Sequence, residues 1–439
     1  MPRPLPLLLV LHGMTDKMHT PPPIKPMQPE HLALPRTMVM PNGVLLHVLD
    51  GAGHGIVRFD ILFGGGYAVQ DKPLQAMFTN RMLREGAGEL TAAEISRRLD
   101  YYGAWIDMYS SQNCNHITLY SMSKHLAPLL HVLEAMVKYP LFPEDNLETV
   151  KSNNKAHFRI NSQKVDVVSQ RYFENALWGE GHPLGHVITA DDYDSITRED
   201  LSAYYAKVYG SRNCVMFVSG SVDEEMLSNI SASFGNEDWG CGSSMEAAVV
   251  MPPASEYGRR TITIPDTMQS AVKIGFMALD SMHPDFNKFR FLCVLLGGYF
   301  GSRLMSNIRE ENGYTYHIAA EMDAYGQRNA FMISSEAANE YVAPLIDEVY
   351  KEIDALLTEP VSVEEIELVR NYILGELCRE YEGVSAKTEV FINAWLSGAG
   401  FESVNRYIDE LASVTPAELM RVARENFVKE RMIEIVAGA

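Results

Sequence analysis

The stretch FVSG at residues 217–220 returns near the end of the chain as IVAG at residues 435–438. A second stretch, SIT at residues 195–197, returns as SVT at residues 413–415, and both pairs are separated by the same number of residues. Copies this far apart are typical of a duplicated domain, because solenoid repeats recur about every 20 to 50 residues. The sequence therefore predicts two homologous domains and draws attention to positions at which the two copies differ.

Length and charge limit the classes of partner. With 439 residues, the chain is too long for one ordinary core and suits two domains of roughly 200 residues. It carries 37 basic and 57 acidic residues, a formal net charge of −20, without a run of lysines or arginines. This charge argues against nucleic acid and anionic membranes as partners. The five cysteines are scattered without C-x-x-C spacing, so we expect buried thiols rather than a zinc ribbon or a disulfide framework.

Residues 1–36 are predicted to form an extended, proline-rich arm, because prolines cluster between residues 21 and 35. Within this arm, the apolar run at residues 5–11 follows Arg3 and weakly resembles a secretory signal. No small-residue cleavage site follows the run, so the cytoplasm is the expected location and the periplasm is the alternative. No other stretch is long and apolar enough to span a bilayer, so no membrane span is expected.

Strand and helix signals alternate within each copy. Residues 57–63, 214–218 and 261–264 are rich in β-branched or alternating apolar residues, which predicts strands. The capping box TAAE at residues 91–94 opens a predicted helix that continues to Tyr102. We therefore predict an α+β fold of two homologous domains, each a mainly antiparallel sheet with helices packed on one face.

The predicted boundaries follow from the repeat and from the turn-forming residues between its copies. The first domain is expected to span residues 37–235 and the second domain residues 259–439. Residues 236–258 hold a mix of turn residues with little periodicity, including WGCGSS at 239–244, and are predicted to be the linker.

The second copy contains the most distinctive stretch of the chain, LLGGYFGSRLMSNIREENGYTY, at residues 295–316. On this stretch, and over residues 37–439 as a whole, the chain resembles the pitrilysin/insulinase-type zinc metallopeptidases. The likeness is to the processing-peptidase branch, whose chains have two domains. The resemblance implies the duplicated α+β fold and, for the family's active members, cleavage of peptides at a zinc ion.

The zinc motif of the active members, His-x-x-Glu-His on the first helix of the first domain, is missing here. Met77 and Arg81 stand at the positions of the two histidine ligands, and Asn80 stands at the position of the glutamate base. Arginine does not lose its proton in proteins and therefore cannot bind zinc. The resemblance also implies a glutamate ligand further along the chain, where residues 149–164 contain no carboxylate. We therefore expect neither a metal nor a cofactor in this chain.

His182 and His186, with Glu180 nearby, form the other close set of potential zinc ligands. Pro183 and Gly185 lie between the two histidines and prevent the regular helix that would place both rings on one face. We therefore interpret this segment as a loop with two ordinary histidines.

The second copy keeps an arginine and a tyrosine close together. Arg309 lies in the last turn of a predicted helix, Gly313 is placed to end that helix, and Tyr316 lies on the strand that follows. The resemblance implies that Arg309 and Tyr316 are the family's arginine/tyrosine pair, whose side chains point into the peptide-binding chamber. A guanidinium and a phenol can donate hydrogen bonds to a substrate carbonyl and to the oxyanion formed when water attacks it. In the alternative interpretation, Arg309 caps its own helix and Tyr316 fills space in the sheet.

These features predict a chain that keeps the substrate-holding part of a peptidase and has lost the metal-binding part. The predicted function is that of a non-catalytic, substrate-binding subunit, inactive alone, of a heteromeric zinc metallopeptidase that cleaves unfolded peptides. Zinc is then expected in the partner, a zinc-bearing homologous chain, and a homodimer is the alternative assembly. Two other functions stay open: an architectural scaffold without a proteolytic role, and an autonomous metallopeptidase with unorthodox ligands.

Overall fold

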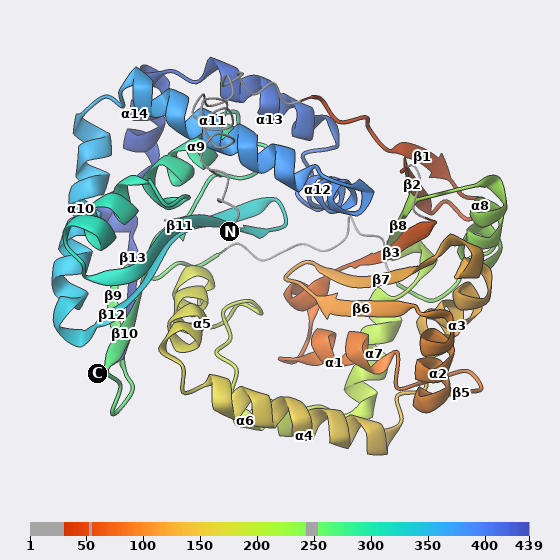
Figure 1. The fold of residues 1–439 in the computed structure, drawn as a ribbon. Helices are drawn as coiled ribbons and strands as arrows, with labels where there is room; N and C mark the ends of the chain where they lie inside the picture. Colours follow the sequence, from red (N-terminus) through yellow and green to blue (C-terminus); the bar gives the residue numbers. More distant parts are fainter. Residues whose placement is uncertain (1–29, 52–54, 243–252, 439) are drawn as a thin grey trace, which may run out of the picture.

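A computed structural model of the chain describes residues 30–51, 55–242 and 253–438. Within these ranges the chain forms two halves that lie side by side, each built around one β-sheet (Figure 1). Most of the predicted arm at residues 1–36 lies outside the described residues, and so does the middle of the predicted linker at residues 236–258.

The first sheet has six strands in the order β1-β2-β8-β3-β7-β6, and every pairing is antiparallel except that of β2 with β8. Its strands are β1 (Arg36–Val39), β2 (Leu45–Asp50), β3 (Ile56–Gly64), β6 (Trp105–Ser110), β7 (Cys114–Met122) and β8 (Cys214–Gly220). A separate small sheet joins β4 (Gly86–Ala87) and β5 (Leu90–Thr91). Among the described strands β6 pairs with β7 alone, so its other side is a free edge of the sheet in this part of the chain.

The second sheet has five strands in the order β11-β12-β10-β13-β9, and its parallel pair is β13 with β9. Its strands are β9 (Gly258–Thr263), β10 (Gln269–Met277), β11 (Thr315–Tyr325), β12 (Arg328–Ala338) and β13 (Ile433–Gly438). FVSG lies in β8 and IVAG in β13, and each of these strands has one parallel and one antiparallel neighbour. The repeated stretch occupies the same place in both sheets, which confirms the predicted duplication and the α+β fold.

The helices of the first half are α1 (Gln75–Met82), α2 (Ala92–Tyr102), α3 (Leu126–Lys138), α4 (Glu144–Asn161), α5 (Val165–Trp178), α6 (Ala190–Ser195), α7 (Arg198–Val208) and α8 (Glu224–Ile230). Those of the second half are α9 (Phe286–Gly297), α10 (Val342–Thr358), α11 (Val363–Glu380), α12 (Val384–Leu396), α13 (Glu402–Ser413) and α14 (Pro416–Asn426). Thr91 and Glu94 form the predicted capping box at the start of α2.

Each sheet carries helices of its own half on one face and one helix of the other half on the opposite face. α5 of the first half packs on β10 and β13, and α12 of the second half packs on β8 and β2. Phe173 of α5 is buried in one cluster with Ile435, and Phe391 of α12 is buried in another with Phe217. The prediction of helices on one face of each sheet is therefore incomplete, because a helix of the other half covers the second face of each sheet.

An ion-pair network centred on the buried Arg58 and Asp60 joins the two halves, through the partly exposed Glu389. Arg58 on β3 donates to Asp60 on the same strand at 2.8 Å and to Glu389 on α12 at 2.6 Å. Arg58 also donates to the carbonyl of Ser385 in α12 at 3.1 Å, and the Thr118 hydroxyl donates to Asp60 at 2.7 Å. Burial raises the pKa of Asp60, and the Arg58 guanidinium opposes that rise. The network therefore fixes where α12 sits on the first sheet.

Candidate functional site

Arg309 lies in a π-helical segment, η6 (Met305–Glu311), that leads into β11. The N–H of Asn312 donates to the carbonyl of Asn307 at 3.0 Å, which closes the wider turn of this helix type. Gly313 follows with φ 66°, a left-handed conformation that glycine adopts without strain. The predicted helix with its glycine stop is present, but its last turn is π-helical, a form often found at functional sites.

The guanidinium of Arg309 lies over an aromatic ring. Its Cζ is 4.6 Å from the centre of the Phe300 ring, and its Nε is 3.4 Å from Oε1 of Glu310. The Arg309 side chain is 31% exposed, so its N–H groups remain open to a ligand. Among the described residues Arg309 makes no hydrogen bond to a helix carbonyl, and the capping interpretation therefore has no contact to support it.

Tyr316 is displayed on a β-bulge at the start of β11, which is an edge strand. The register of β11 with β12 shifts just after Thr315. The Thr315 hydroxyl donates to the carbonyl of Glu336 at 2.6 Å and accepts from the N–H of His317 at 3.2 Å. The Ser335 hydroxyl donates to the carbonyl of His317 at 2.9 Å. The bulge leaves Tyr316 89% exposed, so its side chain does not fill space in the sheet.

Contacts between η6 and β11 bring Arg309 and Tyr316 to the same end of the second sheet. The two segments pack directly on each other, and the N–H of Tyr314 donates to the carbonyl of Ile308 at 3.1 Å. The ring of Tyr314 stacks on that of Tyr341, with ring centres 5.4 Å apart. Arg309 and Tyr316 therefore lie on two segments that pack on each other at one end of the second sheet.

The three degenerate zinc positions lie on α1, and only one of them is fully buried. Arg81 is exposed and Met77 is partly buried against the core, whereas Asn80 has no exposed surface. The Asn80 amide donates to the carbonyls of Tyr109 at 2.8 Å and His116 at 3.1 Å. Asn80 therefore crosslinks α1 to β6 and β7, a role that needs an N–H donor and excludes a carboxylate.

Met77, Asn80 and Arg81 do not provide the nitrogen and carboxylate ligands that a zinc ion needs. Within the described ranges, no group of three His, Cys, Asp or Glu side chains is arranged to hold a metal. His182 stacks on Trp178 with ring centres 4.5 Å apart, and its Nδ1 accepts from the N–H of Leu184 at 3.0 Å. His186 contacts the carboxylate of Asp192 instead, at 3.1 Å. These separate partners agree with the interpretation of both as ordinary loop histidines.

A cavity of about 570 Å³ follows the free edge of β6, beside α1. Residues 106–110 of β6 line it in succession. On the strand, Trp105 stacks on Tyr120 with ring centres 4.7 Å apart, and Tyr109 stacks on His116 at 4.2 Å. Trp105 is 55% exposed and Tyr109 47% exposed, so this edge presents aromatic surface. Burial, reinforced by the positive charge of Arg58, lowers the pKa of His116 to about 4 and keeps its ring neutral at pH 7.

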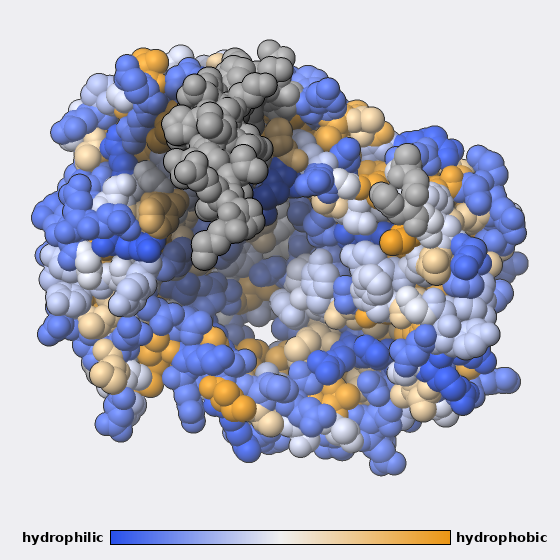
Figure 2. Space-filling model, viewed as in Figure 1, coloured by the Kyte–Doolittle hydropathy of each residue, from blue (hydrophilic) through white to orange (hydrophobic). Residues whose placement is uncertain are grey.

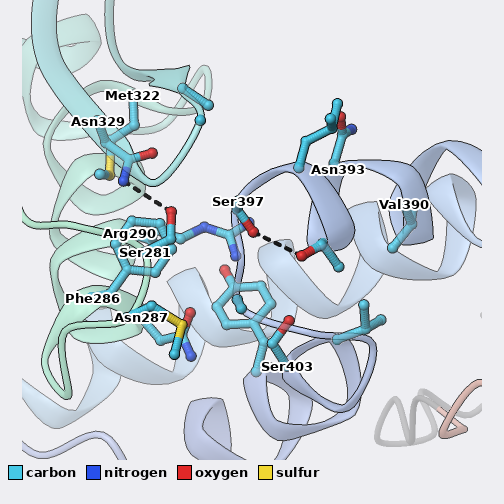
Figure 3. Close-up of a pocket in the computed structure, with 18 of the residues that line it drawn as sticks. Ser281, Phe286, Asn287, Arg290, Met322, Asn329, Val390, Asn393, Ser397 and Ser403 are labelled. Atoms are coloured by element: carbon cyan, nitrogen blue, oxygen red, sulfur yellow. Dashed lines mark hydrogen bonds between the residues drawn. The ribbon is translucent and has the colours of Figure 1, made fainter. Parts of the chain in front are cut away.

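A second cavity, of about 830 Å³, lies between the two halves. Figure 2 shows a recess between the halves with largely hydrophilic walls. The wall combines the turn between β6 and β7 with residues of α9, α11, α12 and α13, several of which are drawn in Figure 3. Tyr109 forms part of the wall of both cavities, so the cavity along β6 lies next to the cavity between the halves.

The sequence analysis missed Phe300, Ser335 and the aromatic edge of β6. Phe300 stands inside the distinctive stretch, but nothing in the pattern shows that its ring lies under Arg309. The signal available for β6 was the alternation of Trp105, Asp107 and Tyr109, which places three side chains on one face of a strand.

Comparison with known proteins agrees with this fold. The family model described as Peptidase M16 inactive domain matches residues 195–373. A crystal structure of a peptidase M16 inactive domain from Pseudomonas fluorescens matches with a TM-score of 0.82 at 21% identity, over 92% of this chain and 98% of that chain. Over residues 195–373 the chain is similar to the M16 peptidases. This is the pitrilysin/insulinase-type family that the sequence resembles, and the present chain lacks that family's zinc motif.

Two curated relatives match most of this chain. An uncharacterized zinc protease, YmxG, of Bacillus subtilis is 21% identical over 400 residues, which cover 90% of this chain and 96% of the relative. A non-peptidase homolog, YmxG, of Helicobacter pylori is 21% identical over 369 residues, which cover 82% and 83%. In the described part of the chain, no helix has both the length and the apolar character needed to cross a membrane.

Proposed function

We propose that this chain is the non-catalytic, substrate-binding subunit of a heteromeric zinc metallopeptidase, completed by a homologous chain with an intact zinc motif. The observation that carries the proposal is a contrast between the two halves. In the first half, Asn80 replaces the glutamate base and is held by two backbone carbonyls. In the second half, Tyr316 stays 89% exposed on a bulge held by two hydroxyl groups. Packing within the chain explains why Asn80 is buried, but it does not explain why Tyr316 is held in an exposed position.

Arg309 and Tyr316 provide hydrogen-bond donors without metal chemistry. A guanidinium and a phenol can both donate to a peptide carbonyl, and these bonds strengthen as negative charge develops on the oxygen. Because Arg309 already rests on the Phe300 ring, its guanidinium loses little freedom when a ligand binds. In the proposed complex the zinc ion and the attacking water belong to the partner, and this chain binds the peptide and stabilises the developing charge.

An extended, unfolded peptide is the substrate class that fits the described surfaces. β6 leaves one side unpaired, and the cavity beside it runs along residues 106–110. A peptide added to this edge would pair through its backbone, which gives affinity with little dependence on sequence. The proposal therefore expects binding of unfolded rather than folded proteins.

The test is a peptidase assay on the purified chain, on a zinc-motif homologue from the same genome, and on their mixture, with bound zinc measured in each. We expect activity only in the mixture and zinc only in the homologue. In the mixture, Arg309→Ala and Tyr316→Phe should each lower kcat by about 100-fold, the effect of removing one oxyanion donor. Arg97→Ala and Tyr101→Phe on α2 are matched controls, because both side chains are well exposed, and should leave kcat unchanged.

Each alternative function has its own outcome in this assay. Zinc and activity in the isolated chain would establish an autonomous peptidase with unorthodox ligands. If kcat of the mixture is unchanged by both substitutions, the chain is an architectural scaffold. Activity of a dimer that contains only this chain would replace the heteromeric assembly with a homodimer.

A further inference from the structure

Arg290 on α9 is a half-buried cation in the cavity between the two halves. Its Cζ lies 4.0 Å from the centre of the Tyr407 ring and 5.9 Å from that of Phe286. Figure 3 shows its side chain reaching from α9 toward Ser397, across the cavity. In the described part of the chain, Arg290 makes neither an ion pair nor a hydrogen bond. A partly desolvated guanidinium without an anion is unfavourable, and its N–H groups are free to donate hydrogen bonds to a ligand.

The walls around Arg290 are mainly neutral and polar. Asn329 and Ser281 are hydrogen bonded to each other at 3.1 Å and form one side of the cavity. Asn393, Ser397 and Ser403 lie on the opposite side (Figure 3). Such groups can bind the amide units of a peptide backbone while the guanidinium binds an anion.

Two carboxylates in the same cavity restrict the kind of anion. Glu410 already accepts a hydrogen bond from Asn287 at 2.7 Å, and Glu380 is exposed. Their negative charge, together with the net charge of −20, disfavours nucleic acids and other polyanions. A ligand with a single carboxylate and neutral polar groups satisfies Arg290 without adding several like charges to the cavity.

The position of the cavity relates it to the peptide path. Because Tyr109 forms part of the wall of both cavities, a peptide docked along β6 would lie next to the cavity that contains Arg290. The cavity volume of about 830 Å³ lies within the range of roughly 300–1,000 Å³ found for ligand sites. A cavity of this size has room for several residues of a peptide.

We propose that the cavity between the halves binds the C-terminal carboxylate of a peptide through the guanidinium of Arg290. A planar guanidinium matches a carboxylate with two parallel hydrogen bonds, which a C-terminal amide cannot accept in the same way. The inference rests on the proposed peptide-binding function and adds to it an anchor for the peptide's end, away from Arg309 and Tyr316.

The test compares two dye-labelled, unstructured peptides that differ only in a free C-terminal carboxylate or a C-terminal amide. Their affinities for the purified full chain are measured by fluorescence anisotropy. We expect the free acid to bind at least about tenfold more tightly than the amide. In Arg290→Gln this ratio should fall to near one, and in Arg290→Lys it should be intermediate, because the charge remains while the planar fork is lost.

Arg97→Gln is the matched control and should keep the wild-type ratio, since Arg97 is exposed on α2. The comparison of acid and amide on the wild-type chain does not depend on how any variant folds. Equal affinities there, or an unchanged ratio in a folded Arg290→Gln variant, would overturn the carboxylate site and leave peptide binding intact. If neither peptide binds, both the carboxylate site and the peptide-binding function are wrong.

Discussion

The hydroxyl oxygens of Ser335 on β12 and Thr315 on β11 lie 3.1 Å apart, directly before the exposed Tyr316. The Thr315 hydroxyl donates to the carbonyl of Glu336 on β12, and the Ser335 hydroxyl donates to the carbonyl of His317 on β11. Side chains rather than regular strand pairing therefore set the direction in which Tyr316 leaves the sheet.

Loss of either hydroxyl should weaken the positioning of Tyr316. In the mixture with the zinc-bearing partner, Thr315→Val and Ser335→Ala should each lower kcat several-fold with little change in KM. In a Tyr316→Phe background both substitutions should have much less effect, because residues that act as a unit are not additive. Ser334→Ala, on the same strand, is the control. Equal losses of kcat in the two backgrounds would show that the hydroxyls act independently of Tyr316.

Restoring the glutamate of the zinc motif should destabilise the chain. Asn80→Glu replaces a donor of two hydrogen bonds with a buried carboxylate that faces the carbonyls of Tyr109 and His116. We expect the free energy of unfolding to fall by about 3 kcal/mol or more, measured by urea denaturation. Met77→His on the same helix should cost about 1 kcal/mol or less, because Met77 lines a cavity. Wild-type stability of Asn80→Glu would contradict the structural role of this amide.

Acid should destabilise the chain through buried histidines. Burial lowers the pKa of His47 to about 4, and its ring packs against Phe217, Trp395 and Phe401. The unfolded chain has a histidine pKa of about 6.5, so between pH 6.5 and about 4 it binds more protons than the folded chain. Stability therefore falls as pH falls through this range, by up to about 3 kcal/mol for this one group.

The pH dependence of thermal unfolding tests this assignment. His47→Phe keeps an aromatic ring in the cluster and removes the titratable group, so its melting temperature should fall less between pH 6.5 and pH 4 than that of the wild type. His116, whose pKa is also lowered to about 4, should account for part of the remaining dependence. Parallel profiles for His47→Phe and the wild type would show that His47 does not contribute.

Two glycines with similar backbone angles should respond differently to alanine. Gly66 has φ 52°, and a Cβ there would lie 2.2 Å from the carbonyl oxygen of Ser111 and 2.5 Å from the backbone nitrogen of Cys114. Gly88 has φ 56° and has open space around the same position. Gly88→Ala should cost about 1 kcal/mol of strain, and Gly66→Ala at least about 2 kcal/mol more. Equal melting temperatures for the two variants would contradict the close packing at Gly66.

The sequence by itself predicted the duplicated α+β fold, and its resemblance to a peptidase family implied the lost zinc motif and the arginine/tyrosine pair. These features are local or periodic. The alternation of apolar residues predicts which face of a strand is buried, and a glycine such as Gly313 predicts a left-handed turn. An arginine such as Arg81 excludes a zinc ligand at its position, because its side chain stays protonated. Each of them can be recognised without knowing which distant residues are neighbours.

Only the tertiary structure decided which distant residues meet. It placed Phe300 under Arg309, Ser335 against Thr315, and the carbonyls of β6 and β7 on the Asn80 amide. It also placed α5 of the first half on the second sheet and α12 of the second half on the first sheet. Such contacts depend on how strands and helices from different parts of the chain pack. Hydrophobic burial is not directional, so the apolar pattern predicts that a face is covered but not which element covers it.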